Sequence, residues 1–197
     1  MTTFEDVMRV YTPKVTEWEG ASQYYDKEAN TFTAYDDEIG GNIPTLGPGL
    51  TGTIGGKPIE VGTVYSAEDV RNEYSNRARG DYDWLSKNVP NWDTLNPNQQ
   101  SSVMSLVHNV GRTGFQDSKA FGHLGAGEFE DFSREAFDPE QGFVRAGEID
   151  PETGRKGIVE GLQNRRRYES ELFNTAWNEV DDTMADYNQT ESAFNYS

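Results

Sequence analysis

The sequence predicts an α+β fold, mainly α, in which a small β-hairpin lobe of about residues 20–65 is joined to a helical lobe of about residues 66–178 that includes an N-terminal helix. Three observations predict it. Residues 31–65 are rich in glycine and β-forming residues, whereas residues 96–111 and residues 158–180 carry apolar side chains at helical spacing. Residues 1–178 are expected to form one domain, and the acidic, polar residues 179–197 a loose tail.

The composition excludes several kinds of site and partner. The 197 residues contain no cysteine, so disulfides and thiolate metal sites are excluded, and the two histidines, His108 and His123, argue against a multi-histidine metal centre. A net charge of −17 argues against nucleic acid as a partner, because two polyanions repel each other. The sequence has neither a signal peptide at its start nor an apolar run of about 18 residues, so we expect no membrane span and synthesis in the cytosol.

The N-terminal segment is predicted to form two short helices. The first carries an apolar stripe at helical spacing, made of Phe4, Val7, Met8 and Tyr11. Thr12 and Pro13 are typical of an N-cap followed by proline at the first helical position, and so predict the start of a second helix. Val15 and Trp18 form the apolar side of that helix, and Gly20 is its expected end.

A hairpin is predicted over residues 31–51, with turn residues at 36–42. Its central stretch, "TAYDDEIGGNIPTLGPGLT", places three acidic residues before the turn and a single threonine, Thr45, after it. The glycine-rich "TGTIGGKPIEVGTVY" is expected to continue as strand or loop. Ser66, followed by two acidic residues, predicts the start of the next helix.

Two further helices are predicted in the second half of the chain. In "NPNQQSSVMSLVHNVG", Asn96 is the expected N-cap, Pro97 the first helical residue, Gln99 the capping-box residue and Gly111 the end. Its apolar stripe consists of Val103, Leu106, Val107 and Val110. The other helix covers about residues 158–180 and has apolar residues at Leu162, Leu172, Phe173 and Trp177. The segment that precedes it, 137–157, contains two Asp-Pro steps and several glycines, and is expected to be loop.

Four motifs in order resemble those of a known family. They are "WEG" at 18–20, "AYDDEIGGNIPTLGPGLT" at 34–51, "HNVG" at 108–111 and "GLQNRRRYESELF" at 161–173. Together they resemble the phage-type, T4-lysozyme-like lysozymes, glycoside hydrolases used as endolysins. The resemblance covers residues 13–178 and rests on the order of the motifs rather than on any one of them. It implies a lysozyme-like fold with the two lobes on either side of a cleft.

The resemblance assigns roles to two residues of the hairpin. Asp37 matches the aspartate of the family's Tyr-x-Asp motif, which makes it the second carboxylate that glycoside cleavage needs beside the general acid. Thr45 matches the threonine that positions the attacking water. Two departures stand out, because Leu50 replaces a histidine of the family and Pro48 an aromatic or branched residue. The turn between Asp37 and Thr45 is also two residues longer than expected. On the residues alone, the acids would be ordinary turn residues and Thr45 only a β-former.

Two glutamates compete for the role of general acid. Glu19 has the family's local setting, since it follows Trp18 and precedes Gly20 at the end of an apolar-striped helix. Burial beside Trp18 and Val15 would raise the pKa of its carboxyl, as general acid catalysis requires. This assignment needs an insertion of about nine residues, "ASQYYDKEA", before the strand.

Glu28 instead has the family's spacing, seven and nine residues before Tyr35 and Asp37. Its assignment needs the helix to continue through Gly20, at a cost of about 1 kcal/mol relative to alanine. It also places Lys27 beside the acid, and a neighbouring positive charge opposes a raised carboxyl pKa. We therefore favour Glu19 and keep Glu28 as the alternative.

The resemblance also suggests substrate-binding residues in the helical lobe. Asn109 matches a polar residue that lines the cleft, and Arg165 and Arg166 match arginines near the family's C-terminus. Without the family, residues 165–167 would be a solvated helix face paired with neighbouring glutamates, and Asn109 an ordinary helix end.

The resemblance implies a muramidase that cleaves the β-1,4 bond between N-acetylmuramic acid and N-acetylglucosamine in peptidoglycan, without a cofactor. Its partner would be the glycan strand, and we expect a monomer. Such an enzyme would wait in the host cytoplasm for release by a holin, or be carried in the virion. The alternative, favoured by the Leu50 substitution and the acidic charge, is a non-catalytic lysozyme-like module that binds glycans or serves as a structural part of the virion.

Overall fold

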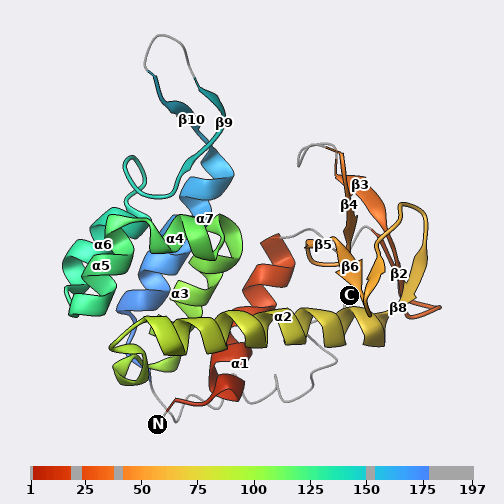
Figure 1. The fold of residues 1–197 in the computed structure, drawn as a ribbon, viewed down its shortest axis with the longest axis horizontal. Coiled ribbons are helices and arrows are strands. Elements are labelled where there is room, and N and C mark those ends of the chain that lie inside the picture. The colour runs from red at the N-terminus through yellow and green to blue at the C-terminus, as the bar shows by residue number, and fades with distance from the viewer. Residues whose placement is uncertain (1, 19–23, 38–41, 150–153, 178–197) are drawn as a thin grey trace. The chain divides into compact units, whose positions relative to one another are not determined.

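The computed structural model describes residues 2–18, 24–37, 42–149 and 154–177, and it confirms the expected α+β, mainly α architecture (Figure 1). The described helices are α1 Phe4–Trp18, α2 Ala67–Asn88, α3 Pro97–Val110, α4 Arg112–Gln116, α5 Lys119–Ala126, α6 Phe129–Phe137 and α7 Glu160–Asn174, with a 3₁₀ turn, η2, at Trp92–Thr94. The described strands are β1 Tyr25–Asp26, β2 Thr31–Thr33, β3 Tyr35–Asp37, β4 Ile43–Leu46, β5 Leu50–Thr51, β6 Thr53–Ile54, β7 Lys57–Pro58, β8 Val64–Ser66, β9 Arg145–Ile149 and β10 Lys156–Ile158.

The described residues divide into two compact units. Residues 2–11 together with 81–177 form the helical unit, and the described part of residues 12–80 forms the strand unit. The division runs within α1 and within α2, next to Gly80, whereas the sequence placed the limit of the small lobe at about residue 65. The first part of α2 thus belongs with the strands. The predicted tail, 179–197, lies outside the described residues.

The strand unit contains small antiparallel sheets joined by tight turns. β1, β2 and β8 form one sheet, β3, β4 and β5 a second, and β6 pairs with β7. The β6–β7 hairpin turns through Gly55 and Gly56, both at positive φ, as a two-residue hairpin loop of this type requires. Ser66 begins α2 as predicted, because its hydroxyl oxygen accepts the N–H of Asp69 at 3.1 Å.

Helix α1 runs unbroken from Phe4 to Trp18, so the prediction of a second helix starting at Thr12 is wrong. Pro13 lies inside the helix, where proline removes one hydrogen bond and costs about 3 kcal/mol. Tyr11 and Val15, four residues apart on either side of Pro13, are both buried. Burial of this continuous apolar stripe offsets the cost of the proline.

Helix α3 is the core of the helical unit, and its N-terminus forms as predicted. Asn96 accepts the N–H of Gln99 at 3.0 Å, and the Gln99 side chain accepts the N–H of Asn96 at 3.0 Å, a reciprocal capping box. The expected single apolar stripe is too narrow, because every residue from Ser101 to Val107 is buried. Three serine hydroxyls on the remaining faces are satisfied by neighbouring elements, which allows the helix to be buried all round.

Helix α7 packs along α3 and supplies the partners for that serine face (Figure 1). It covers Glu160–Asn174, shorter at both ends than the predicted 158–180. Ser102 donates to the backbone carbonyl of Glu169 at 2.7 Å, and Ser105 donates to its Oε1 at 2.6 Å. The Glu169 carboxylate, fully buried, also contacts Arg165 and Arg166.

The segment predicted as loop, 137–157, is only partly so. Strands β9 and β10 pair antiparallel with an irregularity between Lys156 and Gly157, and their hairpin extends from the N-terminal end of α7 (Figure 1). The glycines and Asp-Pro steps of this segment are typical of a loop and gave no sign of the strands. All three residues of β10 are exposed, so β10 also lacks the alternation of buried and exposed residues that marks a strand. Among the described residues, no helix combines the length and apolar character that a bilayer crossing needs.

Candidate active site

The β3–β4 hairpin carries two of the predicted catalytic residues on one face. Tyr35 pairs with Thr45, and Asp37 pairs with Ile43. Because side chains alternate along a strand, Asp37 and Thr45 share a face as diagonal neighbours, a relation that typically separates residues by about 7–8 Å. Asp36 lies between Tyr35 and Asp37, on the opposite face, and is exposed, whereas Asp37 is half-buried. The hairpin thus distinguishes one acid of the run from its neighbour.

Thr45 is held in a defined orientation. Its side chain is buried, and its hydroxyl donates to the carbonyl of Ile43 at 2.9 Å. A hydroxyl has one hydrogen to donate and two lone pairs to accept with. Because the hydroxyl hydrogen is already donated, Thr45 could only accept a hydrogen bond from a water molecule. The lone pairs of that water would then stay free to attack an electrophilic carbon.

The replacement of the family's histidine by Leu50 is accommodated by apolar packing. Leu50 lies on β5 directly opposite Leu46 on β4, and both side chains are buried. Gly47, at φ 54°, starts the turn between them, and a Cβ there would lie 2.7 Å from Val70 Cγ1. Apolar packing of Leu46 and Leu50 therefore takes the place of any polar contact that the family's histidine would make.

Of the two candidate general acids, the structure describes Glu28 but not Glu19. Glu19 lies outside the described residues, directly after the end of α1. Glu28 is exposed in the turn between β1 and β2, where its N–H is accepted by Asp26 Oδ1 at 3.0 Å. The uninterrupted helix that the Glu28 assignment required is not formed, because α1 ends at Trp18 and Tyr25 begins a strand.

The stretch treated as an insertion has a structural role that sequence reasoning missed. Its second half forms β1, which adds an edge strand to β2 through the pairs Tyr25–Phe32 and Asp26–Thr31. Tyr24, next to β1, stacks on Tyr35 of β3 with ring centroids 3.8 Å apart and planes 7° apart. Adjacent tyrosines at 24 and 25 were the available signal: Tyr24 links the inserted stretch to the strand that carries Asp37, and Tyr25 packs against Phe32 of β2.

Asn109 lies in the last turn of α3, in the helical unit, and its side chain is exposed. The helix ends at Gly111, whose φ of 78° suits glycine, as the sequence predicted. The neighbouring Arg112 donates from Nε to Asp81 Oδ1 at 2.7 Å. Asn109 is thus accessible to a ligand of the helical unit, and its substrate-binding role stays a prediction.

Arg165 and Arg166 are not on a solvated helix face, because both are buried between α7 and α3. Arg165 donates from Nη2 to the carbonyl of Ser105 at 3.1 Å, and its Nε lies 3.3 Å from Glu169 Oε1. Arg166 Nε lies 2.6 Å from Glu169 Oε2. Contact between Arg165 and a substrate stays a prediction that this burial does not support.

Burial dominates the titration of this cluster. Removal from water raises the pKa of the Glu169 carboxyl, while the charges of Arg166 and Arg165 and a hydrogen bond from Ser105 oppose that rise. Burial likewise lowers the pKa of the Arg166 guanidinium, against the attraction of Glu169. Loss of hydration is the main cause of both pKa shifts. Pairing between Glu169 and the arginines, together with the hydrogen bond from Ser105, offsets part of the cost of burying the charges.

The described residues include one group that could hold a metal, His123, Glu128 and Asp131 in the helical unit. None of the predicted catalytic residues belongs to it.

Comparisons with known proteins agree with this architecture. The chain is 29% identical over 107 residues to the endolysin of Salmonella phage P22, across 53% of this chain and 69% of that protein. Its fold matches the endolysin from Escherichia coli O157:H7 phage FAHEc1 with a TM-score of 0.63 at 24% identity, over 86% of this chain and 94% of the other. It also matches the muramidase domain of SpmX from Asticaccaulis excentricus with a TM-score of 0.57 at 19% identity, over 83% of this chain and 96% of the other.

The sequence also matches the family model of phage lysozyme over residues 25–169, from β1 to the buried Glu169 of α7. That range includes the β3–β4 hairpin, all of α3 and most of α7. The chain therefore belongs to the phage lysozyme family.

Proposed function

We propose that this protein is an endolysin that hydrolyses peptidoglycan as a muramidase, cleaving the β-1,4 bond between N-acetylmuramic acid and N-acetylglucosamine. The observation that carries the proposal is the phage lysozyme match over residues 25–169. The fold, shared with phage endolysins, supports it. The shared face of Asp37 and Thr45 on the β3–β4 hairpin adds chemical support, because the family's reaction needs a carboxylate and a positioned water.

In this proposal Glu19 is the general acid that protonates the leaving glycosidic oxygen. Asp37 is the second carboxylate, which stabilises positive charge on the sugar ring and orients the attacking water. Thr45 accepts a hydrogen bond from the same water, in keeping with a hydroxyl whose own hydrogen is donated to Ile43. Water then attacks the sugar carbon opposite the leaving group, the bond to the leaving oxygen breaks, and the proton of the water passes to the carboxylate.

The helical unit contributes binding rather than chemistry. Asn109, exposed at the end of α3, contacts the glycan strand in this proposal. Arg165 is buried against Glu169 and contributes indirectly, by holding α7 against α3. No cofactor enters the reaction.

The cellular setting belongs to the same proposal. The enzyme is a monomer that stays in the host cytoplasm until a holin gives it access to the cell wall. The alternative setting is a lysozyme carried in the virion, where the same activity would act on the cell wall as the phage enters the host.

The test compares two neighbouring acids of β3 on purified cell walls. Asp37→Asn should lower the rate of reducing-end release by about 100-fold or more, because it removes a group that acts in the transition state. Asp36→Asn, which removes the same charge from the exposed opposite face, should leave the rate close to that of the unsubstituted protein. Thermal unfolding of both variants checks that each is folded.

Equal activity of the folded Asp37→Asn variant and the unsubstituted protein would remove Asp37 from the mechanism. A folded protein that binds cell walls but releases no reducing ends would instead support the non-catalytic glycan-binding module.

A further inference from the structure

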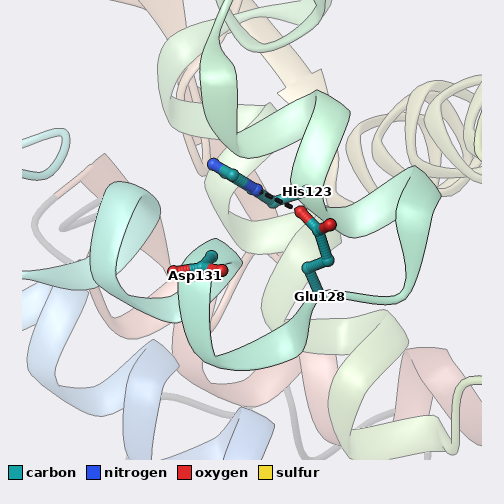
Figure 2. Close-up of side chains that lie close together, drawn as sticks. All are labelled: His123, Glu128 and Asp131. Carbon is teal, nitrogen blue, oxygen red and sulfur yellow. Dashed lines mark hydrogen bonds and ion pairs between the residues drawn. The ribbon is translucent and has the colours of Figure 1, made fainter.

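The turn between α5 and α6 brings together three side chains that can ligate a metal: His123, Glu128 and Asp131 (Figure 2). Each offers one ligand atom, and these atoms all lie within 4.8 Å of one another. The imidazole of His123 points at the carboxylate of Glu128, with Nδ1 2.6 Å from Oε2 (Figure 2). This juxtaposition is independent of the residues proposed for catalysis.

The backbone of this turn is fixed by its own hydrogen bonds. α5 ends at Gly127, in the left-handed region at φ 75° and ψ 16°. The carbonyl of His123 accepts the N–H of Glu128 at 2.9 Å, and the carbonyl of Leu124 accepts that of Gly127 at 3.1 Å. Since the backbone already places His123 and Glu128 beside each other, an ion would need only side-chain rotations to be bound.

The donor set indicates which cation fits. One imidazole nitrogen with two carboxylate oxygens suits Zn²⁺ and related transition metals, whereas Ca²⁺ and Mg²⁺ prefer oxygen ligands alone. At bond lengths of about 2.0–2.2 Å, two ligands of a tetrahedral Zn²⁺ lie about 3.4 Å apart. The separations in the cluster, 2.6 Å for the close pair and at most 4.8 Å, bracket that value. Partial exposure of all three residues leaves room for water as the fourth ligand.

One neighbouring charge competes with a cation for this site. Arg134, one turn along α6, forms an ion pair with Asp131. Both side chains are substantially exposed, 61% for Arg134 and 41% for Asp131, and exposed pairs of this kind are weak. A divalent ion that also binds His123 and Glu128 can therefore displace the guanidinium.

We propose that His123, Glu128 and Asp131 form a binding site for a divalent transition-metal ion, with Zn²⁺ as the best-suited member of the class. The bound ion would connect the end of α5 to the first turn of α6. The composition excluded thiolate metal sites and argued against a multi-histidine centre, and this site needs neither a thiolate nor a second histidine. The proposal does not depend on the muramidase activity.

The first test is calorimetric titration of the chelator-treated full chain with ZnCl₂. His123→Gln should weaken the binding by about tenfold or more, and Glu128→Gln and Asp131→Asn should each weaken it clearly, because each loses a ligand. Glu130→Gln, an equal loss of charge in the same turn, is the matched control and should bind as the unsubstituted protein does. Arg134→Gln should strengthen binding by about two- to fivefold, since it removes the competing charge.

The second test follows the two imidazoles by NMR, and it does not depend on the folding of any variant. Zn²⁺ should shift the ring signals of His123 and leave those of His108 in place, whereas Ca²⁺ at the same concentration should move neither. A shift of His108 alone, equal effects of Zn²⁺ and Ca²⁺, or unchanged affinity in His123→Gln would each overturn the proposal. Those results would mean that an acidic surface, rather than this cluster, collects the ions.

Discussion

Asp36, Asp37 and Thr45 show how a strand places neighbouring acids on opposite faces. Asp37 and Thr45 lie on one face of the β3–β4 hairpin, and Asp36 on the other. The alternation follows from the pleat of the strand alone, so the register of two short strands determines which acid can act beside the threonine. Local sequence shows three acids in a row and gives no means of choosing among them, and the family resemblance supplied the choice.

The general acid is the residue-scale prediction with the largest consequence. Glu19→Gln should lower the rate of cell-wall hydrolysis by about 100-fold or more, because the leaving oxygen then departs without a proton. Glu28→Gln should remain close to the unsubstituted protein, because Glu28 is exposed in the β1–β2 turn and has no helix behind it. Both variants are assayed at equal concentration, with folding checked by circular dichroism. Full activity in Glu19→Gln together with loss in Glu28→Gln would reverse the assignment.

At the scale of elements, the contact between α3 and α7 depends on one buried acid. The Glu169 carboxylate accepts a hydrogen bond from Ser105 and pairs with Arg165 and Arg166, and all four residues are buried. Glu169 thus pairs with an arginine on each side at once.

Loss of that acid should be costly. Glu169→Gln removes the buried carboxylate that pairs with both Arg165 and Arg166 and should lower the free energy of unfolding by about 3–5 kcal/mol. Glu171→Gln, an exposed acid on the same helix, should change it by less than about 0.5 kcal/mol. Urea unfolding of both variants measures the difference. Similar stability of the two variants would show that the ion cluster does not stabilise the α3–α7 contact.

Elements with strong local signals were predictable from the sequence, and those decided by packing were not. The capping box of α3 forms as predicted because Asn96 and Gln99 satisfy each other without help from distant residues. The break predicted at Pro13 does not occur, because burial of Tyr11 and Val15 outweighs a local preference. Strands β9 and β10 were missed because β10 is exposed throughout and the glycines and Asp-Pro steps of this segment are typical of a loop.

The candidate site was predictable to a similar extent. The hairpin follows from turn residues and β-formers, but its register does not, because Asp36 and Asp37 were expected in the turn at 36–42 and instead pair with Pro44 and Ile43. The burial of Arg165 and Arg166 was not predictable, because it depends on serines of α3 that lie about 60 residues away in the chain. An arginine run beside glutamates is typical of a solvated helix, and only the packing of α7 against α3 reverses that interpretation.

For the whole molecule, the net charge of −17 sets the conditions for reaching an anionic cell wall. Added salt shortens the Debye length from about 30 Å at 0.01 M to about 10 Å at 0.1 M, and so screens the repulsion between enzyme and wall. We expect activity that holds or rises from low ionic strength to about 0.3 M. Activity is measured across that series, with thermal unfolding at each salt concentration as the control. A steady fall in activity at constant stability would contradict this expectation.

The most direct test of the central claim identifies the bond that is cleaved. Purified peptidoglycan is digested with the full chain, the products are reduced with borohydride, and the reduced sugar is identified by mass spectrometry. A muramidase leaves N-acetylmuramic acid at the new reducing ends, so reduced N-acetylmuramic acid is the expected product, and Asp37→Asn should yield little of it. New ends that carry N-acetylglucosamine, or cleavage confined to the peptide, would contradict the proposed activity.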